Sequence, residues 1–156
     1  MAGADLSEYA LTSTFDVAVM GGGIVGSALA YQLLALDPSL SVAVIEPDST
    51  YEFASTLRAS GGCRVQFSRP ENIEMSKYGI AFIKGFEQRM ATATHPAHVD
   101  WVEGGYLFVA PPEAVANLER NVRGQQAHGC NVDLLTPAEL AQRFPSSRHA
   151  NPRLSP

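Results

Sequence analysis

Apolar residues near the N-terminal end of the chain fall into blocks that predict a strand, a helix and a second strand. Residues 17–20 (VAVM) are apolar without interruption, which is typical of a parallel strand covered on both faces. A mixed apolar stripe over residues 28–36 predicts a helix with one face on a sheet, ended by Pro38. Residues 41–45 (SVAVI) predict the second strand. The expected fold class is therefore α/β, beginning with a βαβ unit.

A longer helix is predicted after residue 68. Ser68 as N-cap, Pro70 in the first turn and Glu71 at the capping-box position together indicate its start. The helix then keeps one apolar face, which we interpret as core packing and not as a cofactor surface. The residues of this face are Met75, Phe82, Ile83, Phe86 and Met90.

Turn-forming residues divide the rest of the chain into short elements. Gly104 and Gly105 predict a β-hairpin between residues 100–103 and 106–110. The elements expected after it are a helix over residues 113–128 ended by Gly129, a strand over 132–135, and a helix with a capping box at Thr136 and Glu139 and a staple of Leu135 on Leu140.

Glycines fill the turn between the first strand and the first helix. Gly21, Gly23 and Gly26 fit the pattern G-x-G-x-x-G, in which they allow a tight turn, close approach to a pyrophosphate and close packing of helix on strand. The first amides of the helix lack intrahelical partners and lie at its positive end, so they stabilise a phosphate there. The turn predicts a Rossmann-like dinucleotide site.

An acidic residue lies at the sequence position that a dinucleotide site requires. Glu46 ends the second predicted strand, 20 residues after Gly26. A carboxylate there accepts hydrogen bonds from the adenosine ribose and repels a 2′-phosphate, which argues against NADP. An ordinary strand, turn and helix is the alternative to a dinucleotide site, and these residues alone are compatible with both NAD and FAD.

A second group of small residues follows the acidic position. Ser55 and Thr56 are hydroxyl residues close to the expected cofactor, and Gly61 and Gly62 indicate close backbone approach to a flat or charged group, with a plain loop as the alternative. A pure NAD domain would be expected to continue directly into another strand of the sheet, and this chain does not.

Composition restricts the kinds of partner. The chain has 156 residues, a net charge of −5, 46% hydrophobic and 17% charged residues, as in soluble globular proteins. Neither a nucleic acid nor an anionic membrane is expected as a partner of a mildly acidic chain, and no apolar run approaches the ~18 residues of a membrane span. Residues 1–14 resemble neither a signal nor a transit peptide, so we expect a flexible tail and a cytoplasmic location.

Metal and disulfide chemistry is not expected. His95, His98 and Asp100 suggest a metal site, but Pro96 prevents the regular helix that would align the two imidazoles, and ordinary loop histidines are the favoured interpretation. Cys63 and Cys130 make no disulfide framework, which suits a reducing compartment.

With these segments together, the sequence resembles the D-amino-acid oxidase family of FAD-dependent oxidoreductases over about residues 15–145. The most specific segments are DVAVMGGGIVGSALAYQL, VIEPD, AST at residues 54–56, GGCRVQFSRPENIEMS, GGYLFVA and LLTPAELAQRFP. They are most similar to the branch that contains a mitochondrial FAD-dependent oxidoreductase linked to complex I assembly, so the resemblance also allows a mitochondrial location.

The resemblance implies FAD as the cofactor and assigns residues to its parts. Glu46 would bind the adenosine ribose, Ser55 and Thr56 would supply cofactor-contacting hydroxyls, and Arg64 would lie toward the isoalloxazine ring. Gln66 is a further polar residue of that segment, and for both Gln66 and Arg64 a structural role is the alternative. Covalent attachment of flavin to Cys63 is a minor alternative to a small buried thiol at that position. The turn residues implied at the pyrophosphate are Gly21, Gly22, Gly23, Ile24, Val25 and Gly26.

The resemblance also implies a chemistry and an organisation. Family members oxidise a C–N bond of an amine or amino acid by hydride transfer to flavin; no catalytic residue is identified here. We expect residues 15–94 to form the first part of the FAD domain, 95–145 to open an α+β substrate domain, and 146–156 (SSRHANPRLSP) to be an irregular tail. Full members are much longer, so we expect an N-terminal fragment that needs a further C-terminal part. The alternatives are a non-catalytic flavoprotein assembly factor and an NAD-binding module.

Overall fold

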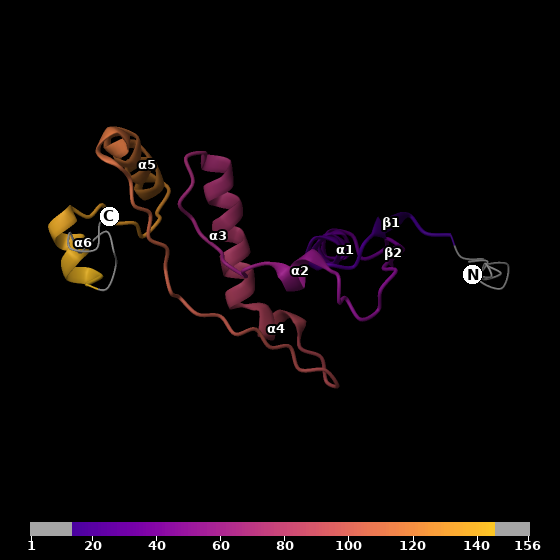
Figure 1. Ribbon diagram of the computed structural model, residues 1–156. Helices are drawn as coiled ribbons and strands as arrows, with labels where there is room; N and C mark the ends of the chain where they lie inside the picture. Colours follow the sequence, from indigo (N-terminus) through magenta and orange to yellow (C-terminus); the bar gives the residue numbers. More distant parts are fainter. Residues whose placement is uncertain (1–13, 146–156) are drawn as a thin grey trace, which may run out of the picture. The chain divides into compact units, whose positions relative to one another are not determined.

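The computed structural model describes residues 14–145, and the chain divides into two units at residues 62 and 63 (Figure 1). Each unit is described by itself. Nearly all of the predicted N-terminal tail and the whole of the predicted tail over residues 146–156 lie outside the described residues. The expected boundary between an FAD domain and a substrate domain at residue 94 stays a prediction.

The first unit is the predicted βαβ unit with a short helix after it. The two strands pair in parallel, with Val17 opposite Val42 and Met20 opposite Ile45. Parallel strands need a crossover connection, and α1 supplies it while packing on both strands. The elements are β1 (Val17–Met20), α1 (Ile24–Leu36), β2 (Val42–Ile45) and α2 (Ser55–Arg58).

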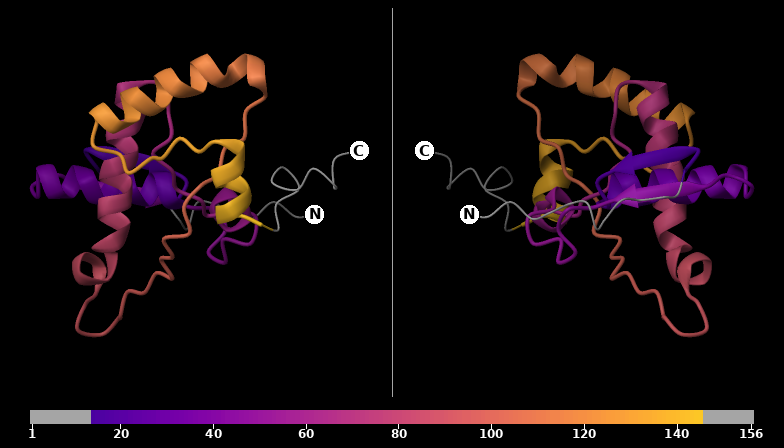
Figure 2. Two further views of the ribbon diagram at one scale, coloured as in Figure 1. Left: turned by 90° about the vertical axis from the view of Figure 1, so that its left-hand side faces the viewer. Right: turned by 90° about the vertical axis from the view of Figure 1, so that its right-hand side faces the viewer.

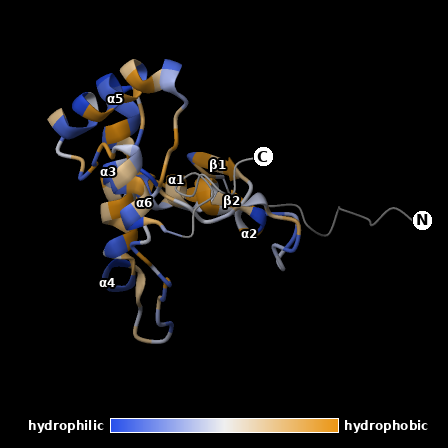
Figure 3. Ribbon diagram, turned by 60° about the vertical axis from the view of Figure 1, so that its left-hand side comes forward, coloured by the Kyte–Doolittle hydropathy of each residue, from blue (hydrophilic) through white to orange (hydrophobic). Residues whose placement is uncertain are grey.

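The sheet of this unit is covered less than the apolar pattern predicts. Val19 and Ala30 are buried between sheet and helix, but 76% of Met20 is exposed, and Val44 and Ile45 are exposed as well. Figure 3 shows both strands in the hydrophobic colour. The expectation of a strand covered on both faces is therefore wrong for the described residues, because their sheet has two strands and a single helix lies against it.

The second unit contains helices joined by long segments without regular structure. The predicted long helix is confirmed, but it is interrupted at Gly85, a residue of low helix propensity. The prediction of Ser68 as N-cap is wrong, because Arg69 holds that position and Pro70 is the first helical residue. The elements are α3 (Pro70–Lys84), α4 (Phe86–Met90), η2 (Pro112–Ala114), α5 (Val115–Ala127) and α6 (Pro137–Arg143).

Neither of the two later strand predictions is confirmed. Residues 100–110 and 132–135 have no strand structure, so the expected hairpin is absent from the described residues. Local turns take its place, since the amide of Gly104 donates to the Val102 carbonyl at 3.0 Å. A strand needs a neighbour with which to pair, and the apolar pattern alone does not supply one.

The predicted ends of the last two helices are confirmed. Gly129 follows α5 with φ of 73°, the left-handed conformation that a glycine allows after a helix. Thr136 and Glu139 form the full capping box, in which each side chain binds the other residue's backbone amide. No helix within residues 14–145 is long and apolar enough to span a bilayer.

The core of the second unit lies where α5 crosses α3 near the N-terminal end of α3 (Figure 2). Ile73 of α3 is only 1% exposed, and Val122 and Cys130 are buried. The buried Gln125 side chain donates from Nε2 to the Phe67 carbonyl at 3.0 Å, and Lys77 Nζ donates to the His128 carbonyl at 2.8 Å. This small core fixes the segment that carries Phe67.

Replacing Ile73 with alanine is expected to lower the free energy of unfolding by about 2–4 kcal/mol, because the cavity in this core has few neighbours that can fill it. Urea unfolding followed by circular dichroism measures the change. Met75→Ala on the same helix is the matched control, since 65% of Met75 is exposed, and a change of about 0.5 kcal/mol or less is expected. Equal losses in the two variants would contradict the assigned core.

Candidate functional site

The helix α1 begins in direct contact with the glycine turn. Gly21 has φ of 94°, and its amide continues the sheet by donating to the Ile45 carbonyl at 2.8 Å. A Cβ at Gly26 would lie 1.9 Å from the Gly21 carbonyl oxygen, which no side chain can tolerate. Only glycine at residue 26 therefore allows the helix to start this close to the end of β1.

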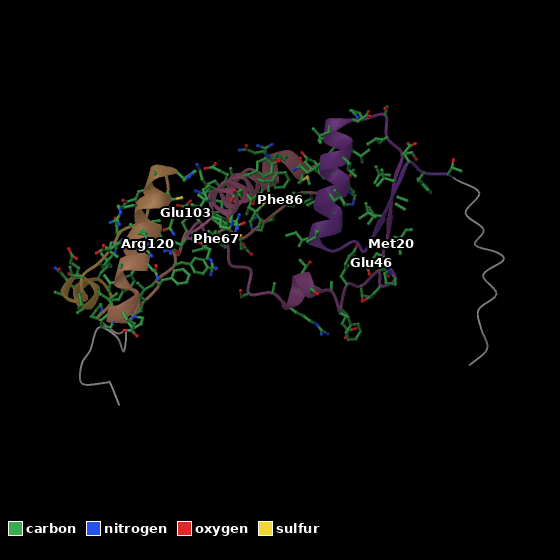
Figure 4. All side chains as sticks on the ribbon, turned by 90° about the horizontal axis from the view of Figure 1, so that it is seen from above. Met20, Glu46, Phe67, Phe86, Glu103 and Arg120 are labelled. Carbon is green, nitrogen blue, oxygen red and sulfur yellow. The ribbon has the colours of Figure 1, made fainter. Side chains whose placement is uncertain are left out.

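The carboxylate of Glu46 is held against the same turn by two backbone amides. Its Oε2 accepts from the Gly22 amide at 2.7 Å, and its Oε1 accepts from the Asp48 amide at 3.1 Å. Figure 4 shows Glu46 beside Met20, where the two parallel strands end. Each carboxylate oxygen can accept a second hydrogen bond, so the group remains able to bind ribose hydroxyls.

Backbone donors gather at the start of α1. The first intrahelical bond is made by the Ser27 amide to the Gly23 carbonyl at 2.9 Å. Within residues 14–145, the amides of Gly23, Val25 and Gly26 donate to no acceptor. They lie at the positive end of a 13-residue helix, and an anion is stabilised there.

Thr56 completes this end of the helix. Its Oγ1 accepts from the Ile24 amide at 3.0 Å, which compensates for the lack of a side-chain cap at Gly23. The threonine O–H proton remains free to donate outward. Ser55 is exposed at the start of α2, so the structure brings Thr56, but not the Ser55 hydroxyl, into hydrogen-bond contact with the turn.

Two further residues contact the turn and were not identified from the sequence. The Ser27 hydroxyl donates to the Gly22 carbonyl at 2.7 Å and fixes the turn from inside the helix. The phenol of Tyr51 lies over Gly22, with Oη 2.7 Å from the position of a Cβ on that glycine. Ser27 lies one residue after the last glycine of the pattern, and no motif marks Tyr51.

Arg64, Gln66 and Cys63 belong to the second unit. The guanidinium of Arg64 stacks on two rings, 4.8 Å from the centroid of Phe67 and 5.2 Å from that of Phe108. Within residues 14–145 it pairs with no carboxylate. The Gln66 side chain donates to the Tyr106 carbonyl at 3.1 Å, a structural bond, and Cys63 is a half-buried free thiol.

The histidine segment has the geometry of an ion-pair cluster. His98 donates to Asp100 at 2.9 Å and to Glu87 at 2.5 Å, and these hydrogen bonds raise the pKa of His98 above its ordinary value. Across the part of the chain that the structure describes, no three His, Cys, Asp or Glu side chains are grouped so as to hold a metal ion.

Comparison with known proteins finds similarity that extends from this turn over most of the chain. The model of the family described as "FAD dependent oxidoreductase" (DAO) matches residues 16–153. "FAD-dependent oxidoreductase domain-containing protein 1" of Bos taurus is 37% identical over 134 residues, which cover 83% of this chain and 28% of that protein. Its homolog in Drosophila melanogaster is 36% identical over 132 residues, covering 83% of the chain and 25% of that protein.

A second relative matches a shorter part of the chain. "L-2-hydroxyglutarate dehydrogenase, mitochondrial" of Homo sapiens is 44% identical over 55 residues, or 35% of this chain and 12% of that protein. No solved structure matches. The chain thus spans only about a quarter of the length of the curated relatives that it matches over most of its own length.

The first unit fits the adenosine diphosphate part of FAD. A helix start without side chains at Gly23 and Gly26 allows phosphates to approach unpaired amides, and Glu46 presents acceptors at the neighbouring strand end. The family match indicates FAD as the dinucleotide, and this removes NAD from the alternatives.

Replacing Gly26 with alanine is expected to abolish FAD binding and to destabilise the first unit, because the new Cβ would collide with the Gly21 carbonyl. Bound flavin absorbance and the melting temperature measure the two effects. Gly79→Ala is the control, since no atom lies within 4 Å of a Cβ there and alanine in a helix is favoured by about 0.5–1 kcal/mol. Retention of FAD by the Gly26 variant would contradict the assigned contact.

Replacing Glu46 with glutamine is expected to weaken FAD binding and to lower stability by about 1–3 kcal/mol. Both carboxylate oxygens accept from backbone amides, so a glutamine NH₂ group would face another donor. Titration with FAD and urea unfolding measure these effects. Glu52→Gln, at an exposed position of the same loop, is expected to change neither, and a loss of affinity there would point to general charge and not to this geometry.

Proposed function

The chain belongs to the D-amino-acid oxidase family of FAD-dependent oxidoreductases, and on that premise we propose that it is part of an enzyme that oxidises a C–N bond of an amine or amino acid. The observation that carries the FAD-dependent part of the proposal is the turn at Gly21 to Gly26, where strand ends, helix amides and Glu46 meet. The choice of a C–N bond rests on the family resemblance. FAD held there would supply the hydride acceptor for the carbon beside nitrogen; the nitrogen would lose a proton, and water would hydrolyse the resulting imine.

The residues of the first unit hold the cofactor and select it. The unpaired amides of Gly23, Val25 and Gly26 stabilise phosphate oxygens, and the Thr56 hydroxyl donates beside them. The carboxylate of Glu46 accepts from the ribose and disfavours a phosphate at that position. Their combined role is to anchor the adenosine diphosphate part of FAD.

The role of Arg64 toward the flavin, which the family resemblance implies, stays a prediction. Two rings hold its guanidinium in place, and no carboxylate within residues 14–145 neutralises its charge. A stacked guanidinium keeps the edges of its planar fork available to oxygen acceptors. This supports a role toward an electron-rich group.

A second candidate is oxidation of a C–O bond in a 2-hydroxy acid. The observation that favours it is the 44% identity to L-2-hydroxyglutarate dehydrogenase over 55 residues. The two reactions share the cofactor and the hydride acceptor, and they differ in the atom that carries the departing proton. The residues of the first unit are compatible with either reaction, so only a comparison of substrates distinguishes the two.

Anaerobic reduction of the protein-bound flavin by matched substrates tests the proposal. Alanine against lactate, and glutamate against 2-hydroxyglutarate, differ only in an amino or a hydroxyl group. The amino compound or a simple amine is expected to bleach the flavin absorbance, with ammonia or the free amine as a product.

Three other outcomes have distinct meanings. Bleaching by the hydroxy acid alone would replace the proposal with the second candidate. Bound flavin that no member of a broad panel reduces would favour a non-catalytic role, in which FAD stabilises a surface used in assembly. A protein that binds no FAD would contradict all three functions.

A further inference from the structure

Tyr51 places a phenol over the glycine turn. A Cβ at Gly22 would lie 2.7 Å from Tyr51 Oη, 3.4 Å from its Cε1 and 3.3 Å from the Cβ of Glu46. The phenol and the acidic side chain therefore approach the turn at the same glycine. The Tyr51 hydroxyl binds no group within residues 14–145, and 37% of the residue is exposed. Its donor is available to a ligand.

The backbone of Tyr51 is strained. Its φ of 59° is the only left-handed value of a residue other than glycine in the described part of the chain. A bulky residue adopts this conformation at a cost in free energy, and such residues cluster at ligand-binding sites. The strain is confined to the residue whose side chain reaches Gly22.

Hydrogen bonds of the preceding turn maintain the strained conformation. The amide of Tyr51 donates to the Asp48 carbonyl at 3.0 Å, and the Ala54 amide donates to the Tyr51 carbonyl at 2.9 Å. Asp48 Oδ1 accepts from both the hydroxyl and the amide of Thr50, and these bonds lower the pKa of the Asp48 carboxyl. Asp48 therefore stays an ionised acceptor near neutral pH, and the turn retains its shape.

We propose that Tyr51 is a cofactor-binding residue whose hydroxyl donates a hydrogen bond to the adenosine monophosphate half of FAD, alongside Glu46. This inference rests on the proposed function, because it needs FAD at the glycine turn. Glu46 is an acceptor and repels a nearby phosphate. The neutral Tyr51 hydroxyl can donate a hydrogen bond to a cofactor oxygen without adding charge to the site.

Titration of the chain with FAD, followed by flavin fluorescence, tests the role of the hydroxyl. Tyr51→Phe is expected to weaken FAD binding by about tenfold, as for loss of one hydrogen bond to a polar or charged group. Tyr106→Phe is the matched control, because within residues 14–145 Tyr106 contributes only its carbonyl to a hydrogen bond, and it is exposed. Equal affinities of wild type and Tyr51→Phe would overturn the proposal.

Two further readouts separate binding from structure. ADP, used as a competitor of FAD, is expected to lose affinity for the Tyr51→Phe variant by the same factor as FAD does. An unchanged affinity for ADP would place the contact elsewhere on the cofactor and overturn the proposal. The melting temperature without FAD is expected to match that of wild type, because the hydroxyl has no partner among the residues that the structure describes; a lower value would show a structural role instead.

The outcome for wild type distinguishes this inference from its premise. If the wild-type chain binds neither FAD nor ADP, then the nucleotide site itself is wrong and both proposals fail. If wild type binds FAD and the phenylalanine variant binds it equally well, then only the role of Tyr51 fails.

Discussion

The contact between Gly26 and the Gly21 carbonyl is the constraint on which the candidate site depends. A Cβ on residue 26 would lie 1.9 Å from that oxygen, so only a glycine fits there and the first turn of α1 packs directly on the end of β1. This closeness brings three unpaired amides to the strand ends. The same closeness places Ser27 within reach of the Gly22 carbonyl, which locks the turn from the helix side.

The rest of the nucleotide site is assembled around that turn by polar side chains from later segments. Glu46 accepts from the amide of Gly22, 24 positions earlier in the sequence. Thr56 accepts from the amide of Ile24, 32 positions earlier. Both use backbone amides as partners. A site held mainly by backbone groups tolerates variation of exposed side chains such as Val25, 80% of which is exposed.

The chain buries little apolar surface for its composition. Ile73 is the largest fully buried side chain among the described residues, and large side chains such as Met20 and Phe108 are exposed. The chain spans about a quarter of the length of its relatives. The family and its cofactor follow from this chain, whereas the substrate is a proposal.

Local signals in the sequence were sufficient for several features of the structure. The βαβ order, the end of α5 before Gly129 and the capping box at Thr136 depend on near neighbours, and all are confirmed. The position of Glu46 was also correct, because β1, α1 and β2 have lengths that their apolar blocks define. The roles of Ser55, Thr56 and Arg64 toward FAD stay predictions, although Thr56 does bind the start of α1.

Only tertiary structure decided the features that depend on distant partners. The strand predicted over residues 106–110 has no neighbour with which to pair and remains irregular, and Met20 is exposed because the described sheet has only two strands and one helix against it. The contact of Tyr51 with Gly22 could not be read from any motif, since it results from the left-handed backbone of Tyr51 at the end of the turn that begins at Asp48. Sequence determines what each segment favours by itself, and long-range contacts determine which of those preferences is realised.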